Sequence, residues 1–80
     1  MTITILAFGI ARDILGGSET IMELLSGITV DDLRKKLYAD YPELTKLASL
    51  AIARNNEYAE GPEEITERDE VVLIPPVSGG

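Results

Sequence analysis

Alternating polar and apolar residues open the chain and predict a β-strand over residues 2–8. Its β-branched residues favour an extended backbone, and the alternation places Ile5 and Phe8 on opposite faces. A second strand is expected over residues 19–24, where it can pair with the first. Between the two strands, residues 10–15 can form a short helical turn that ends at a glycine pair.

The middle of the chain carries the pattern of an amphipathic helix. Apolar residues from Val30 to Leu44 recur at spacings of three and four, which places them in one stripe. Thr29 is a good N-cap, and Asp32 is placed to complete a variant of the capping box. Because Pro42 disfavours a helical backbone in the residue before it, we expect the helix to break there.

Short strands are expected after the helix. Residues 50–54 are a third strand candidate, and Asn55 and Asn56 tolerate the positive φ of a tight turn. Residues 63–69 form a polar connector that we expect to be solvated. Residues 70–74 form the last strand, and their four consecutive apolar positions predict a central strand covered on both faces.

This order of elements predicts a two-layer α+β domain, in which a mixed sheet packs on one main helix. If the last strand pairs in parallel with the first, the arrangement is a ubiquitin-like β-grasp. We expect the domain to span residues 1–74. Residues 75–80 would follow it as an extended tail.

Composition narrows the range of functions. The chain has 7 Lys and Arg against 14 Asp and Glu, a net charge of −7. Proteins bind nucleic acids and anionic membranes through clusters of Lys and Arg, so we expect neither as a partner. The charge favours a basic protein or a cationic groove as the partner, unless the acidity only keeps a small domain soluble. The absence of Cys and His excludes zinc-thiolate sites and Cys or His nucleophile–base pairs. We therefore expect no metal site, no self-contained active site and a cytoplasmic location.

The most distinctive chemistry lies in the last six residues, Pro75-Pro76-Val77-Ser78-Gly79-Gly80. Prolines hold a segment extended, and glycine can thread a channel too narrow for other residues. We predict that the carboxylate of Gly80 is the reactive group and that Gly79 and Ser78 thread into a partner. ATP could activate this carboxylate as a mixed anhydride with AMP. Sulfur would then give a thiocarboxylate, whereas a lysine amine would give an isopeptide bond.

The same end of the chain resembles the C-terminal signature of the small subunit of molybdopterin synthase. The matching residues run from Asp69 to Gly80, and Pro-Pro-Val-Ser-Gly-Gly is their most specific part. Residues 53–58 resemble the strand-turn-strand of that family, and residues 5–13 resemble its first strand and short helix. The resemblance therefore spans essentially the whole chain.

This resemblance implies a β-grasp sulfur carrier in molybdenum cofactor biosynthesis. An E1-like enzyme would transiently adenylate Gly80 with ATP, and a sulfur donor, either a sulfurtransferase or a cysteine desulfurase, would convert it to a thiocarboxylate. No cofactor would be bound permanently. The tail would enter the large subunit within a heterotetramer and supply sulfur to cyclic pyranopterin monophosphate. The active site would lie mainly on the large subunit, which makes this chain a non-catalytic subunit.

The docking contacts that the resemblance implies combine an aromatic residue, which is exposed unless it packs under the helix, with the end of the last strand. They are Phe8, Leu73, Pro75, Pro76 and Val77. Three alternatives stay open. The chain could be the sulfur carrier of the thiamine pathway, a ubiquitin-like modifier that joins substrate lysines, or an interaction domain with an inert tail. The Pro-Pro-Val segment favours the molybdenum pathway over the thiamine pathway.

Overall fold

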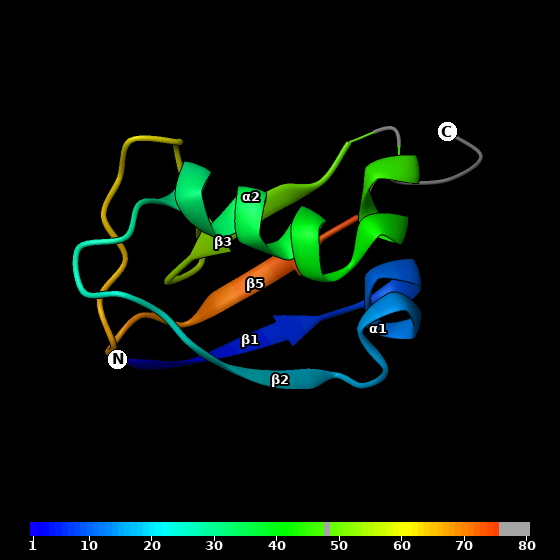
Figure 1. Ribbon diagram of the computed structural model, residues 1–80, viewed down its shortest axis with the longest axis horizontal. Coiled ribbons are helices and arrows are strands. Elements are labelled where there is room, and N and C mark those ends of the chain that lie inside the picture. Colours follow the sequence, from blue (N-terminus) through cyan, green and yellow to red (C-terminus); the bar gives the residue numbers. More distant parts are fainter. Residues whose placement is uncertain (48, 76–80) are drawn as a thin grey trace.

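The computed structural model describes residues 1–47 and 49–75. Figure 1 shows a sheet with one helix lying across one of its faces. The elements of the described residues follow in the order β1 (Thr2–Ala7), α1 (Gly9–Leu15), β2 (Glu19–Glu23), α2 (Val30–Asp40), the 3-10 helix η1 (Pro42–Lys46), β3 (Ala51–Arg54), β4 (Glu57–Tyr58) and β5 (Val71–Ile74).

The strands form one mixed sheet in the order β2-β1-β5-β3-β4. β1 pairs antiparallel with β2 and parallel with β5, with Ile5 opposite Val71. β3 runs antiparallel to both β5 and β4. The parallel pairing of the first and last strands confirms the predicted β-grasp arrangement.

The helix α2 begins and ends where the sequence indicates. The Thr29 hydroxyl accepts a hydrogen bond from the Asp32 N–H (3.2 Å), and the Asp32 carboxylate accepts one from the Thr29 N–H (3.4 Å). This is the predicted capping box. The helix ends at Asp40, and Pro42 then begins η1. No helix among the described residues combines the length and apolar character needed to cross a membrane.

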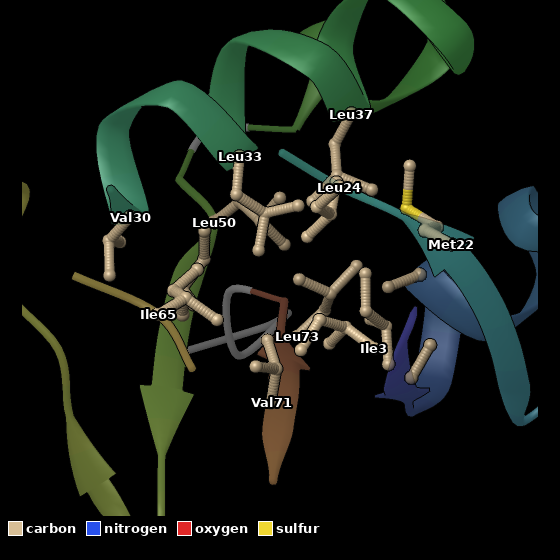
Figure 2. Close-up of a cluster of buried hydrophobic side chains, with 14 of the residues drawn as sticks. Ile3, Met22, Leu24, Val30, Leu33, Leu37, Leu50, Ile65, Val71 and Leu73 are labelled. Atoms are coloured by element: carbon tan, nitrogen blue, oxygen red, sulfur yellow. The ribbon is translucent and has the colours of Figure 1, made fainter. Parts of the chain in front are cut away.

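The core fills the space between α2 and one face of the sheet. Figure 2 shows Val30, Leu33 and Leu37 of α2 pointing toward strand residues that include Ile3 and Val71. All five side chains are buried. The stripe read from the sequence is therefore the surface that holds the helix on the sheet.

The prediction of a solvated connector over residues 63–69 is confirmed at Glu64 and at residues 66–68, which are exposed, but it is wrong at Ile65. Ile65 is 1% exposed and belongs to the same core cluster as Leu33 and Leu50 (Figure 2). Its N–H donates to the Ile28 carbonyl at 2.8 Å, and Glu64 forms a β-bridge with Thr29. One apolar residue within a polar run is enough to pull the connector against the start of α2.

The prediction for β5 is confirmed in one part and wrong in the other. β5 is the middle strand of the sheet, as expected. Val71 and Leu73 are buried, but Val72 and Ile74 are only partly buried. The strand is therefore not covered on both faces, because α2 covers only one of them.

Candidate functional site

The sheet face turned away from α2, here called the open face, carries an apolar groove. Leu6, Val72 and Ala53 are successive cross-strand partners, so their side chains form a row across three strands. The groove has a volume of about 410 Å³. Its apolar lining consists of Leu6, Phe8, Ala53, Tyr58, Val72 and Ile74.

Two aromatic rings and three polar side chains complete the groove. Phe8 is 56% exposed and Tyr58 is 73% exposed. Exposed aromatic residues beside apolar side chains are typical of docking surfaces, because large rigid rings bury much area on binding. The polar lining residues are Asn56, Glu57 and Glu70. The two carboxylates favour a partner with basic residues around an apolar contact.

Phe8 is held outside the core by the turn between β1 and α1. It has an extended backbone (φ −127°, ψ 161°) and serves as the N-cap of α1. Gly9 follows with φ +56°, a left-handed conformation that glycine adopts without strain. The chain therefore turns into α1 directly after Phe8, which leaves the aromatic ring in the groove.

The same turn receives the end of β5. A Cβ atom at Gly9 would lie 3.4 Å from the Pro75 Cγ, so the proline ring packs against the bare glycine. Pro75 is partly buried and is the last residue that the structure describes. The described part of the chain therefore ends next to the turn that carries Phe8, and Ile74 links this point to the groove.

A polar cluster fixes the other end of β5. The Arg54 guanidinium donates to Glu63 Oε1 (2.7 Å), to Asp69 Oδ2 (3.3 Å) and to the Glu64 carbonyl (2.7 Å). The Asn55 side chain donates to Asp69 Oδ1 (2.9 Å) and accepts from the Glu70 N–H (3.0 Å). These bonds tie the connector to the turn after β3, so β5 starts from a defined position.

The polar cluster shifts the pKa of Asp69. Its side chain is only 9% exposed, and this burial by itself raises its pKa. The Thr66 N–H, the Asn55 amide and the Arg54 guanidinium together outweigh burial, so the pKa of Asp69 lies below its ordinary value. The carboxylate is therefore held ionised next to Arg54, where it stabilises the connector.

The expected site residues fall into three groups. Phe8 is exposed in the groove, and Pro75 packs against Gly9 at the end of the described residues. Leu73 is fully buried and faces α2, so the prediction that its side chain is a docking contact is wrong. The strand period of two directs Leu73 inward and its neighbours Val72 and Ile74 outward. Five predicted residues lie outside the described residues, and their roles stay predictions: Pro76, Val77, Ser78, Gly79 and Gly80.

Of the groove residues, the sequence interpretation identified only Phe8. A usable signal existed for the others, because one helix can cover only one face of a sheet and alternate residues of each strand must face the other side. The apolar groove residues that were missed are Leu6, Ala53, Tyr58, Val72 and Ile74, and the polar ones are Asn56, Glu57 and Glu70.

The sheet order and the single covering helix define a β-grasp protein. The sequence matches the ThiS family over residues 5–80, and the chain belongs to that family. It is 35% identical over 83 residues to a Chlamydomonas reinhardtii protein named molybdopterin synthase sulfur carrier subunit, and the alignment covers 100% of both chains. An Arabidopsis thaliana protein of the same name is 33% identical over 79 residues, which cover 98% of this chain and 82% of the relative.

Solved structures agree with this assignment. SAMP1 from Haloferax volcanii, a small archaeal modifier protein, superposes with a TM-score of 0.83 at 25% identity, covering 100% of both chains. The comparisons confirm both the expected fold and the resemblance noted in the sequence.

Proposed function

We propose that this chain is the sulfur carrier subunit of a molybdopterin synthase, with Gly80 as the sulfur-carrying residue. The observation that carries the proposal is the full-length similarity to relatives that bear this name. The groove near Pro75, the last described residue, supports it, because a carrier must dock on a partner while its end reaches an active site.

The chemistry requires two steps at the carboxyl group of Gly80. In the first, the carboxylate oxygen attacks the α-phosphorus of ATP, and pyrophosphate leaves as the acyl-adenylate forms. In the second, hydrosulfide or an equivalent sulfur nucleophile attacks the acyl carbon, and AMP leaves with the C–O electron pair. The product is a thiocarboxylate, which is a better nucleophile than the original carboxylate. An E1-like enzyme would catalyse the first step, and a sulfur donor would provide the sulfur for the second.

The large subunit would dock on the open face. The groove offers Phe8 and Tyr58 as exposed apolar anchors, and Glu57 and Glu70 lie beside them. Anchors of this kind dominate binding free energy, while flanking charges set the orientation and the rate of association. We therefore expect the partner to present an apolar patch bordered by Lys or Arg.

A reconstitution that bypasses activation tests the proposed function. The chain is prepared as an intein fusion and released with sulfide, which yields the Gly80 thiocarboxylate directly. Single-turnover incubation with the large subunit and cyclic pyranopterin monophosphate should give molybdopterin in proportion to the carrier added. The same chain released as the carboxylate is the matched control. Failure of the thiocarboxylate to give more product than the carboxylate would contradict the proposal.

Protein modification is a second candidate, favoured by the structural similarity to SAMP1. In that case Gly80 would form isopeptide bonds with substrate lysines. Conjugates that survive reducing agent and boiling in detergent would support it. Because the chain matches the ThiS family, a sulfur carrier of the thiamine pathway is a further candidate. Copurification with a thiazole synthase in place of the large subunit would favour that pathway.

A further inference from the structure

Among the residues that the structure describes, β2 forms an unpaired edge of the sheet. It is a terminal strand in the sheet order, and Figure 1 shows it as the outermost strand on its side. Met1 and Leu24 exchange two backbone hydrogen bonds, of 2.8 and 2.7 Å. Hydrogen-bonded pairs recur at every second residue of an antiparallel ladder, so Met22 and Thr20 also turn their backbone groups toward β1. The intervening residues turn theirs away from the sheet.

The three residues with outward backbone groups are Glu19, Ile21 and Glu23. Their side chains lie on the open face, since Ile21 is the cross-strand partner of Thr4. Ile21 is 69% exposed, and both glutamates are exposed. The edge therefore combines free backbone donors and acceptors with one apolar side chain between two carboxylates.

This charge pattern disfavours pairing of β2 with the β2 strand of a second copy of the chain. Antiparallel pairing of two β2 strands centred on Ile21 would place Glu19 of one copy opposite Glu23 of the other. Like charges directly opposite each other destabilise strand pairs, and charged edge residues commonly prevent self-association. A basic strand would instead meet an opposite charge at both positions.

We propose that the outer edge of β2 is a strand-addition site for a basic, extended segment of another protein. The added strand would carry an apolar residue opposite Ile21 and Lys or Arg opposite Glu19 and Glu23. Backbone hydrogen bonds would supply affinity, and the two charge pairs would set the register. The net charge of −7 adds long-range attraction for such a segment.

This edge is separate from the groove assigned to the large subunit. The groove lies over β1, β5, β3 and β4, whereas an added strand would lie beyond β2. The inference does not depend on sulfur transfer, so the two proposals can fail independently.

A designed peptide provides the test. The probe is Thr-Lys-Thr-Val-Thr-Lys-Thr, acetylated and amidated, whose central Val can pair with Ile21 while both Lys face the glutamates. Amide hydrogen exchange of the ¹⁵N-labelled chain is followed with and without saturating peptide at low salt. We expect exchange at Ile21 and Glu23 to slow at least about tenfold, because their N–H groups become hydrogen-bonded. Exchange at Thr20 and Met22, already paired with β1, should change little.

Three results would overturn the proposal: unchanged exchange at Ile21 and Glu23, chemical-shift changes centred on Tyr58 and Val72, or equal binding of the peptide with Glu in place of Lys. Concentration-dependent dimerisation through β2 in sedimentation experiments would also overturn it, since the occupant would then be a second copy.

Matched variants separate backbone pairing from charge. Ile21→Pro removes one outward donor and is compatible with an edge strand, so it should abolish the protection while the groove residues keep their chemical shifts. Glu19→Gln with Glu23→Gln keeps every backbone group and should weaken peptide binding about fivefold or more. The control pair Glu43→Gln and Glu67→Gln has the same net charge and should leave binding within about twofold. Equal weakening by both pairs would show that only net charge acts.

Discussion

Replacement of Phe8 by Ala tests whether the open face binds the large subunit. A Phe side chain buries about 150–250 Å² when fully covered, and 56% of Phe8 is still exposed in the free chain. About 100 Å² is therefore available to a partner, which corresponds to about 2.5 kcal/mol at about 25 cal/mol per Å². We predict that Phe8→Ala raises the Kd for the large subunit about 70-fold.

Calorimetric titration of the large subunit with the wild-type and Phe8→Ala chains measures this change. The part of Phe8 that is already buried gives the variant a lower free energy of unfolding, by up to about 2 kcal/mol. Binding must therefore be compared well below the midpoint of thermal unfolding. Leu25→Ala is the matched control, because Leu25 is 83% exposed but does not line the groove. A Kd within about twofold of wild type for Phe8→Ala, or equal weakening by Leu25→Ala, would refute the assignment of the groove.

Three further predictions concern the connector, the polar cluster and the tail. Ile65→Ala should lower the free energy of unfolding by about 2–5 kcal/mol in urea denaturation, because Ile65 is buried, and a loss under about 1 kcal/mol would contradict its anchoring role. Asp69→Asn should have a lower free energy of unfolding than wild type above about pH 4. This difference should shrink as the pH falls through the lowered pKa of Asp69, because the wild-type carboxylate is then protonated. A difference that grows in acid would contradict the prediction. Gly80→Ala should slow adenylation while shifting the unfolding midpoint by no more than about 2 °C, and a larger loss of stability would place Gly80 within the packed domain.

Local sequence signals were sufficient to predict the start of the main helix and the turn after β3. The Thr29–Asp32 capping box depends on residues three apart, and the structure contains both of its hydrogen bonds. Asn55 and Asn56 adopt positive φ (54° and 70°) in the turn after β3, as their side chains allow. Each of these features is decided by neighbours in the chain, so no knowledge of the tertiary structure was needed.

The errors arose where the outcome depends on distant parts of the chain. The apolar run in β5 indicates burial, but only the number of covering helices decides whether one face or both are covered. The same ambiguity hid Val72 and Ile74, whereas Leu73 became a docking candidate through the family resemblance. Ile65 was missed for a related reason, since its partners belong to the core beneath α2. Hydrophobic periodicity gives the inward direction of a side chain only once the layers are known.

The arrangement of β5 suits the proposed docking of the chain on the large subunit. β5 is the central strand, flanked by β1 and β3, and the Arg54 cluster fixes the connector before it. Pro75 packs on Gly9 at its other end. Contacts therefore hold β5 in place at both of its ends, and docking on the open face would place Pro75, the last described residue, at a defined position on the partner.

The most direct measurement of the central claim is the intact mass of the chain after incubation with ATP, the E1-like enzyme and sulfide. We predict a gain of about 16 Da, as one oxygen of the Gly80 carboxylate is replaced by sulfur, and no gain when ATP is omitted. Tandem mass spectrometry should locate the change at Gly80. An unchanged mass with an activating enzyme that adenylates its own verified carrier would contradict the claim that this chain carries sulfur.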